Sequence, residues 1–374
     1  MKIKKYSEFR LKVPKEIRDL SDIFQKNGKR LYIVGGYCRD ILMGLNPIDI
    51  DLSTDSLPDE TISFLNGKYK VDLVGKAFGV IIVSLGSMKI EIASFRSDVS
   101  IGRHPDVKLG VSIEDDVKRR DITISSLFFD IQKNRIVDLV GGIKDIEQRI
   151  IRMVGNPKER LEEDQLRSLR CIRFACRYDF SFDRTTKEDL KRYSNLSSIS
   201  QERIWEEFKK AFEQSKDFNR YLGYITEFNI WDQVFGSNIN TNLVKSKDFV
   251  VIVANLFKNE PVNNKMKESL FNRMVQNYKV EIETALKVIF LLLLLSFKVE
   301  DVFDLFKKRQ QCAISDSTII ECMKVQNIYS DILVKFVEYR PSISAEELMK
   351  KGFKGAALGA EIKRLEVEKF KQMI

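Results

Sequence analysis

A change of texture near residue 150 constrains the fold of this chain more than any other feature. Before it, short runs rich in β-branched residues alternate with turns that carry Gly or Asp, a pattern typical of strands. The runs are RLYIVGG, GVIIVSL, KIEIASF, ITISSLFFD and RIVDLV. After residue 155 glycine becomes sparse, and apolar residues recur at helical spacing almost to Ile374. The pattern predicts an α+β head followed by an all-helical remainder.

The ends of one helix can be read from the sequence of the head. PKEIRDLSDIFQKNG predicts a helix that begins at Pro14 and ends at Gly28. The longest apolar run, Val288 to Leu295, is too short to span a bilayer and predicts a core helix. The basic N-terminus lacks an apolar stretch, so we expect neither a signal peptide nor a membrane partner.

Charge, cysteine and histidine usage narrow the function classes. Lys and Arg exceed Asp and Glu by nine, which favours a polyanionic partner without identifying it. The five cysteines form no CxxC pair, which is typical of buried thiols in a reducing cytoplasm, and we expect a cytoplasmic protein. The single histidine, His104, excludes sites that need two histidines but leaves a serine–histidine triad formally possible.

Residues 33–54, IVGGYCRDILMGLNPIDIDLST, carry two carboxylates in an otherwise apolar run. Asp49 and Asp51 are two residues apart, so in a strand they share a face. Adjacent carboxylates raise each other's pKa, and burial adds to the cost of charging them. A divalent cation removes this cost, and Mg²⁺ prefers one or two carboxylates with water and phosphate oxygens in its other positions. Asp49 and Asp51 are therefore the predicted metal ligands.

The residues upstream of this pair suit a phosphate. Gly35 and Gly36 let the backbone approach an anion closely, and CRDILMG can open a helix whose N–H groups face it. Arg39 lies one turn into that helix and is predicted to reach the same oxygens. A bare D-x-D is more often a turn with two surface aspartates. The G-G-x-x-R-D motif ten residues upstream favours the metal and phosphate interpretation.

A second cluster of charges has helical spacing. Its members follow one another at intervals of three, three, three and four, and so predict one stripe on a helix: Asp164, Arg167, Arg170, Arg173 and Arg177. Unmixed like charges cost on the order of 0.2–0.5 kcal/mol per neighbouring pair, so the stripe predicts a phosphate or base partner. Beside it runs an apolar stripe that is predicted to anchor the helix: Leu166, Leu169, Ile172 and Cys176.

Asp164 and Arg167 together predict a choice between bases. A carboxylate only accepts hydrogen bonds and a guanidinium only donates them. Asp164 would accept from N4 of cytosine or N6 of adenine, while Arg167 would donate to N3 or N1. Uracil and guanine present the opposite pattern, and each failed contact leaves an unpaired polar group at a cost of about 1–3 kcal/mol. The pair therefore predicts acceptance of C and A and rejection of U and G.

In this order along the chain, the motifs resemble those of the class II tRNA nucleotidyltransferases (CCA-adding enzymes) and bacterial poly(A) polymerases, in the DNA polymerase β superfamily. The matching segments are G-G-x-x-R-D…D-x-D, FGVIIVSLGSMKIEIASFR, GRHPDVKLGVSIEDDVKRRDITISSLFFD, GNPKERLEEDQLRSLRCIRFACRYDF and ISQERIWEEFKKAF. The resemblance covers about residues 28–212, and beyond them only the helical texture is similar. Five motifs in order make it specific.

The resemblance implies roles for single residues. Asp49 and Asp51 would hold the metal, and Arg120 and Asp121 would hold the ribose and phosphates of the incoming nucleotide. Asp164 and Arg167 would read the base, with Arg170 and Arg173 completing the nucleotide-binding helix. Glu91 shares a strand face with Lys89 and Ala93, which makes it a third carboxylate near the metals or a strand-edge charge. The family's Asn-Ala after Thr-Ile is Ser125-Ser126 here, so we expect a different support for this loop with activity retained.

The same resemblance implies a domain order and an activity. We expect a polymerase-β-like catalytic head over residues 1–150, a helical neck over 151–212, and an all-helical body and tail over 213–374 that bind tRNA. The expected reaction is template-independent addition of C, C and A to the tRNA 3′ end from CTP and ATP. It would use two Mg²⁺ ions, release pyrophosphate and need no obligatory protein partner.

Several alternatives stay open. Poly(A) polymerases of this type tend to carry a long basic extension, which this sequence does not show. CC-adding enzymes of the family have a deleted flexible loop, whereas RSDVSIGRHPDVKLG retains that loop here in slightly shortened form, which disfavours this alternative. An A-adding enzyme is not distinguished. A non-catalytic RNA-binding protein on this scaffold would have no reason to keep Asp49 and Asp51. A small-molecule nucleotidyltransferase is disfavoured by the long basic helical tail.

Overall fold

The computed structural model groups the chain into two compact units. The first comprises Met1–Ile199 with Glu213–Asp217, and the second Ser200–Phe212 with Phe218–Ile374. The structure describes all residues except 1–12, 48, 99–106, 237–238, 243 and 261–265, so His104 and part of the predicted flexible loop lie outside the described residues. The expected boundary at residue 150 falls inside the first unit. That unit therefore joins the expected head to most of the expected neck.

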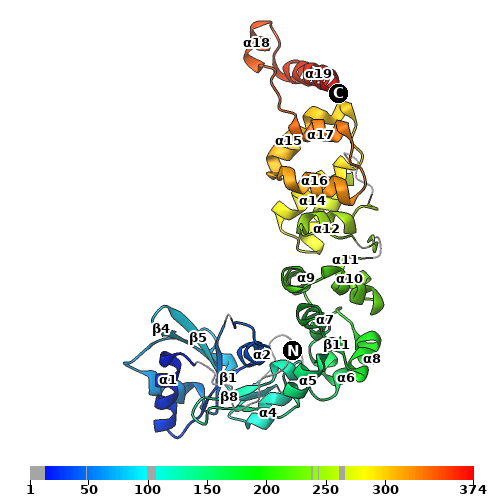
Figure 1. Cartoon of the computed structure of the whole chain (residues 1–374). Helices are drawn as coiled ribbons and strands as arrows, with labels where there is room; N and C mark the ends of the chain where they lie inside the picture. The colour runs from blue at the N-terminus through cyan, green and yellow to red at the C-terminus, as the bar shows by residue number, and fades with distance from the viewer. Residues whose placement is uncertain (1–12, 48, 99–106, 237–238, 243, 261–265) are drawn as a thin grey trace. The chain divides into compact units, whose positions relative to one another are not determined.

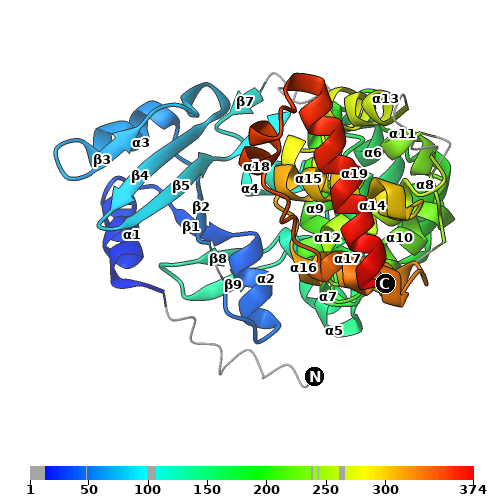
Figure 2. The same cartoon turned by 90° about the horizontal axis from the view of Figure 1, so that it is seen from above.

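A mixed sheet forms the centre of the first unit (Figure 1). Within the described residues it has seven strands in the order β3-β4-β5-β2-β1-β8-β9, and their labels follow this order across Figure 2. The strands are β1 (Leu31–Val34), β2 (Asp51–Thr54), β3 (Lys70–Asp72), β4 (Val80–Leu85), β5 (Met88–Ser94), β8 (Phe128–Asp130) and β9 (Arg135–Val137). β2 and β5 are parallel, and the other neighbours are antiparallel.

Two shorter strand pairs lie outside this sheet. β6 (Arg96–Asp98) pairs with β7 (Val107–Leu109), and β10 (Ile150–Ile151) pairs with β11 (Ser181–Phe182). The helices of the first unit are α1 (Lys15–Lys26), α2 (Gly36–Leu42), α3 (Pro58–Leu65), α4 (Ile113–Lys118), α5 (Gly142–Gln148), α6 (Pro157–Glu163), α7 (Arg167–Tyr178) and α8 (Arg184–Tyr193). Short 3₁₀ turns occur at Lys76–Phe78 and Thr123–Ser125.

The predicted α+β class is confirmed, and most predicted elements of the head lie where the sequence puts them. α1 follows Pro14 and ends before Gly28, whose φ of +72° is a left-handed conformation that glycine adopts without strain. The prediction of a single strand for the run ITISSLFFD was wrong, because only Phe128–Asp130 of it forms a strand of the sheet. Its first part is a 3₁₀ turn, held by the Ser126 hydroxyl that donates to the carbonyl of Ile122 at 2.8 Å.

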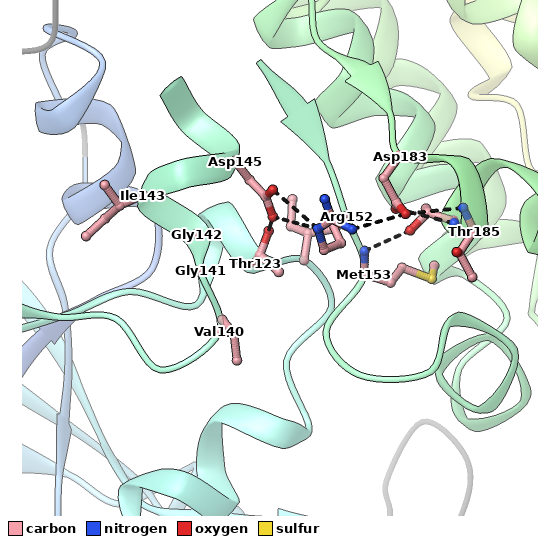
Figure 3. Close-up of polar contacts among 12 residues, drawn as sticks. Thr123, Val140, Gly141, Gly142, Ile143, Asp145, Arg152, Met153, Asp183 and Thr185 are labelled. Atoms are coloured by element: carbon pink, nitrogen blue, oxygen red, sulfur yellow. Dashed lines mark hydrogen bonds and ion pairs between the residues drawn. The ribbon is translucent and has the colours of Figure 1, made fainter. Parts of the chain in front are cut away.

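A chain of polar contacts joins the sheet to the helices that follow it (Figure 3). The Thr123 hydroxyl donates to Asp145 at 2.7 Å, and Arg152 bridges Asp145 at 3.1 Å to Asp183 at 3.2 Å. Asp183 in turn caps α8 by accepting from the backbone N–H groups of residues 185 and 186. Backbone bonds run beside this chain, from Thr123 N to Arg152 O and from Val154 N to Asp121 O. The segment around Asp121 is therefore fixed to the first residues of the expected neck.

The second unit is helical. Its helices are α9 (Gln201–Gln214), α10 (Phe218–Glu227), α11 (Trp231–Phe235), α12 (Phe249–Leu256), α13 (Met266–Asn272), α14 (Ile282–Leu294), α15 (Val302–Cys312), α16 (Asp316–Val325), α17 (Asp331–Glu338), α18 (Ala345–Lys350) and α19 (Gly355–Met373). A π-helical turn at Arg273–Asn277 and a 3₁₀ turn at Val299–Asp301 connect some of them.

Aromatic rings form much of the core of this second unit. Phe208 is buried and packs edge-on against Phe218 and Phe235, with ring centroids 5.3 and 5.0 Å away. The apolar run from Val288 lies mostly in α14, where nearly all its side chains are buried, as predicted for a core helix. Across the described parts of the chain, every helix is too short or too polar to cross a bilayer. All five cysteines are buried and free, as the sequence predicted.

Candidate active site

A cavity of about 810 Å³ lies in the first unit, where β2 and β5 face the segment from α4 to α7. One wall carries the carboxylates of Asp51 and Glu91 from the sheet, and the other carries both basic and acidic side chains from the segment between α4 and α7. The charged residues of the lining are Asp51, Glu91, Arg96, Asp98, Asp115, Lys118, Arg119, Arg120, Asp121, Glu159, Arg160, Glu162, Glu163, Asp164, Arg167 and Arg170. Most of the predicted site residues therefore meet in one cavity.

Asp51 and Glu91 form the acidic pair of the sheet wall. They are direct neighbours in the parallel register of β2 and β5, so both side chains project from the same face. Asp49 is exposed and lies just before β2, so its predicted place on the same strand is wrong. The reason lies in β1, which ends opposite Asp51 at Val34 before Gly35 turns the chain away with a φ of +69°. Beyond that point β2 has lost its antiparallel partner.

The electrostatics of Asp51 differ from those of an ordinary surface aspartate. The surrounding walls withdraw its carboxylate partly from water, and the charges of Glu91 and Asp49 add to this, so together they raise the pKa of Asp51. Arg120 opposes the shift. Within the described residues, no three His, Cys, Asp or Glu side chains already form a metal-binding cluster. The hard oxygens of Asp51 and Glu91 nevertheless match the ligand type that Mg²⁺ prefers, with the remaining positions left for water and phosphate.

Arg120 and Asp121 lie on the opposite wall, and both have protein partners. Arg120 donates to Asp116 through Nε and Nη2 at 3.2 and 3.0 Å, and its guanidinium lies 4.6 Å from the ring centre of Phe128. Asp121 accepts from Arg170 Nε at 2.8 Å. Burial would raise the pKa of Asp121, but the charges of Arg170 and Arg167 outweigh it and lower that pKa to about 2. The contact of these residues with a nucleotide stays a prediction.

The predicted recognition helix is interrupted. Asp164 follows the end of α6, and its carboxylate accepts from the backbone N–H of Leu166 at 3.1 Å, which turns the chain before α7 begins at Arg167. The prediction of one helix that includes Asp164 is therefore wrong, although Asp164 and Arg167 still line the same cavity. The predicted apolar stripe is confirmed, since all four of its side chains are buried: Leu166, Leu169, Ile172 and Cys176.

The arginines of α7 are paired from other elements. Arg167 donates to Glu163 at 2.6 Å and to the carbonyls of Arg160 and Arg119 at 2.9 and 2.8 Å. The partners of the other three are Asp121 for Arg170, Gln214 for Arg173, and Gln214 and Asp40 for Arg177. Each arginine of the stripe thus has a partner within the fold, and three of the four pair with a carboxylate, so the stripe does not by itself require an external anion. Sequence reasoning missed Glu163, although it directly precedes Asp164 in the chain.

Arg39 occupies a different place from the predicted one. Only 4% of it is exposed, and it is not among the residues that line the cavity. Its Nη1 donates to the Ser125 hydroxyl at 2.8 Å, its Nε donates to Asp40 at 2.8 Å, and its guanidinium lies 4.7 Å from the ring centre of Tyr178. Arg39 therefore ties α2 to α7 and to the 3₁₀ turn. Ser125, which stands where the motif expected from the resemblance has Asn, supplies one of these bonds.

The glycine turn itself has the predicted form. Gly35 has a positive φ and precedes α2, which begins at Gly36, so the backbone at this point has the freedom that a close ligand would need. A Cβ on Gly36 would come within 3.2 Å of Arg39 Nη2, so glycine also leaves room for the arginine. Contact of Gly35 and Gly36 with phosphate stays a prediction.

Comparison with known proteins finds a matching head domain and several relatives of this chain. Residues 31–152 match the poly A polymerase head domain. Over 250 residues the chain is 31% identical to poly(A) polymerase I of Salmonella typhi, which covers 63% of this chain and 53% of that protein. It is 34% identical over 227 residues to the CCA-adding enzyme of Bacillus subtilis, covering 59% of this chain and 56% of that protein. The chain thus spans about half the length of the curated relatives it matches.

Solved structures share the fold over almost the whole chain. The CCA-adding enzyme of Bacillus stearothermophilus in complex with CTP superposes with a TM-score of 0.70 at 19% identity, covering 95% of this chain and 92% of that one. The Thermotoga maritima CCA-adding enzyme, solved with tRNA, gives a TM-score of 0.66 at 20% identity, with coverages of 96% and 92%. Together these similarities show a poly A polymerase head domain at residues 31–152, with CCA-adding enzymes and poly(A) polymerases among the relatives of the chain, and a fold shared with solved CCA-adding enzymes.

Proposed function

We propose that this protein is a tRNA nucleotidyltransferase that adds C, C and A to the tRNA 3′ end from CTP and ATP, in the cytoplasm and without a template. The observation that carries the proposal is the single cavity whose sheet wall has Asp51 and Glu91 and whose helical wall has Asp164 and Arg167. Relatives named CCA-adding enzyme support the choice of reaction.

The carboxylates are proposed to bind divalent metal. Asp51 and Glu91 from neighbouring strands, with Asp49 just before β2, would hold two Mg²⁺ ions together with phosphate oxygens of the substrate. Bound Mg²⁺ supplies a lowered pKa for the attacking 3′-hydroxyl and neutralises charge on the leaving pyrophosphate. The raised pKa of Asp51 fits this role, because a nearby cation stabilises the ionised form that the neighbouring carboxylates disfavour.

Asp164 and Arg167 are proposed to select the base. The carbonyls of Arg160 and Arg119 and the carboxylate of Glu163 take three of the five N–H donors of Arg167. Two donors remain for the acceptor edge of cytosine or adenine, while Asp164 would accept from their amino groups. The bonds that Arg167 already makes hold its guanidinium in one orientation, and a fixed orientation is needed to distinguish bases by their hydrogen-bond patterns.

The proposal is tested on the full chain with three tRNAs that end at the discriminator base, at C and at CC. Each is incubated with Mg²⁺ and one nucleoside triphosphate at a time, and the 3′ ends are sequenced. We expect CTP to be used on the first two tRNAs and ATP on the third, with addition stopping after A. Long A tails would show a poly(A) polymerase, and addition limited to CC or to A would show one of the partial enzymes. No incorporation by active-site-intact protein would overturn the assignment.

A further inference from the structure

Asp116 is a fully buried carboxylate beside the cavity, and both of its oxygens are occupied by arginines. Its exposed fraction is 0%. Arg119 donates to Oδ1 through Nε and Nη2 at 3.0 and 2.8 Å, and Arg120 donates to Oδ2 through the same two nitrogens at 3.2 and 3.0 Å. One carboxylate thus fixes two consecutive guanidinium groups, each along the same edge.

This arrangement leaves the third nitrogen of each guanidinium available. Arg119 Nη1 and Arg120 Nη1 make no hydrogen bond to any residue that the structure describes, and both arginines line the cavity. Each Nη1 carries two N–H donors. Asp116 binds Nε and Nη2 of each arginine and so fixes the orientation of both guanidinium groups. Their Nη1 donors stay available for a ligand.

Arg96 also helps to hold Asp116 in place, and the guanidinium groups around Asp116 outnumber the carboxylates. The backbone N–H of Arg96 also donates to Oδ1 at 3.2 Å, and Arg119 Nε donates to the carbonyl of Arg96 at 3.1 Å. The Arg96 side chain lines the same cavity, and burial together with the charges of Arg119 and Arg120 lowers its pKa. Asp98 also pairs with Arg96, at 3.7 Å, so two carboxylates face three guanidinium groups. Within this group of five side chains the guanidinium groups therefore outnumber the carboxylates by one, and an anion would neutralise that charge.

We propose that Asp116 is a positioning residue that aims the Nη1 groups of Arg119 and Arg120 at the phosphates of the incoming nucleoside triphosphate. The inference rests on the proposed function for the identity of the ligand. Guanidinium groups held in a fixed orientation suit phosphate oxygens, which accept several charge-assisted hydrogen bonds at once. Asp116 itself touches no ligand, so its effect on binding passes through the two arginines.

The test is equilibrium binding of CTP to the full chain with Mg²⁺, measured by calorimetry for the wild type, Asp116→Asn and Glu114→Gln. Asparagine keeps the shape of the side chain but presents an amide NH₂ to one of the two arginines, which releases it. We expect Asp116→Asn to weaken CTP binding about ten- to a hundredfold, the effect of one lost charge-assisted contact. Glu114 is an exposed acid on the same turn of α4, and its variant should bind CTP like the wild type.

Two further measurements separate positioning from general structural support. In an Arg119→Ala background, Asp116→Asn should weaken CTP binding severalfold less than it does in the wild type, because one of the two groups it positions is gone. The ratio of affinities for CTP and dCTP should stay constant, because the contact is to phosphate. An undiminished effect of Asp116→Asn in that background, or unchanged CTP affinity in the single variant, would overturn the inference. A collapsed CTP to dCTP ratio would also overturn it, since the arginines would then bind ribose.

CTP binding tests the role of Asp116, and extension of tRNA tests the proposed function, so the failure of one proposal can be told from the failure of the other. If the wild type binds CTP and the variants behave as expected but no tRNA is extended, the proposed function is wrong and the role of Asp116 stands. If tRNA is extended normally and Asp116→Asn binds CTP like the wild type, the role of Asp116 is wrong and the proposed function stands. Wild-type protein that binds no CTP overturns both.

Discussion

At the scale of single residues, the cavity contains one neighbouring pair of like charges and one of opposite charges. Asp51 and Glu91 are like charges placed side by side by strand register, and their mutual repulsion appears in the raised pKa of Asp51. Asp121 and Arg170 are opposite charges placed side by side, and the pKa of Asp121 is low. Arg120 opposes this repulsion without cancelling it, so a bound cation would stabilise the first pair, whereas Arg170 already supplies the counter-charge of the second. We therefore expect the first pair to bind a ligand and the second to shape the wall.

Removing the carboxylate of Asp51 should therefore abolish chemistry without harming the fold. We expect Asp51→Ala to lower nucleotide incorporation by about a hundredfold or more, the effect of losing a metal-borne charge in the transition state. The free energy of unfolding should not fall, because the like-charge repulsion disappears as well. Incorporation is measured with CTP on a tRNA that awaits its first C, and Asp59→Ala on the exposed first turn of α3 is the control. Wild-type rates in Asp51→Ala would contradict the metal assignment.

At the scale of elements, α7 does two jobs along its length. Its first turn carries Arg167 to the cavity, and its last two turns carry Arg173, Arg177 and Tyr178 into a buried cluster with Asp40, Arg39 and Gln214. The arginines look alike in the sequence because their spacing is regular. They differ in the fold because their partners come from distant segments, 48 residues away for the contact of Arg167 with the Arg119 carbonyl. Such partners cannot be read from helical periodicity.

The first turn of α7 is expected to set base choice. Arg167→Ala removes the donor that excludes bases bearing an N–H at the same position, so discrimination of CTP against UTP should shrink roughly ten- to a hundredfold. The measurement is kcat/KM for both nucleotides on a tRNA that awaits its first C. Arg177→Ala, on the same helix but away from the cavity lining, should keep the ratio. An unchanged ratio in Arg167→Ala would make Arg167 a structural residue.

The contact between α2 and the last turn of α7 is expected to contribute to the stability of the fold. Arg39 and Asp40 are almost fully buried together, so Arg39→Ala leaves the Asp40 carboxylate with only the Tyr178 hydroxyl at 3.2 Å and Arg177 at 3.8 Å, and should lower the free energy of unfolding by about 3 kcal/mol. Arg39→Lys should recover little of it, because an ammonium cannot make the paired bonds and lie flat on Tyr178.

The stability measurement for Arg39 is urea unfolding of the full chain. The double variant Arg39→Ala/Asp40→Ala is the matched control and should recover part of the loss, since it removes the isolated charge. Full stability of Arg39→Ala combined with a raised KM for all four nucleotides would restore the original hypothesis that Arg39 binds phosphate.

The sequence predicts some of these features of the site correctly and others not. It located Asp51, the glycine turn, the break in texture and the apolar face of α7, because each is a local pattern of spacing. It misplaced Asp49, Asp164 and Arg39, whose positions depend on where β1 ends, on a side-chain cap and on partners from another segment. It passed over Asp116 and Glu163, since a carboxylate that positions arginines has the same local context as a solvated one.

At the scale of the whole molecule, the helical second unit is expected to bind the tRNA body. The chain carries an excess of nine positive charges, and contacts to phosphate release condensed counterions. The affinity of the full chain for tRNA should therefore fall steeply as salt rises from about 50 to 200 mM, with a slope of about −0.7 to −0.9 per phosphate contacted. Filter binding over this range measures the slope, with the Asp51→Ala variant as a protein that cannot extend its ligand. A flat response would contradict the tRNA-binding role.

The bridge from Asp145 through Arg152 to Asp183 bears on how such proteins can be recombined (Figure 3). A chimaera cut at residue 150, where the sequence texture changes, would take Asp145 from one parent and Arg152 and Asp183 from the other. It would also split the β10–β11 pair from the turn at Thr123 that the same segment supports. A cut near residue 200, where the two compact units divide, keeps every one of these partners together. The exchangeable module is therefore the sheet with α6, α7 and α8 still attached, together with residues 213–217 from the same parent, because Gln214 accepts from Arg173 and Arg177 of α7.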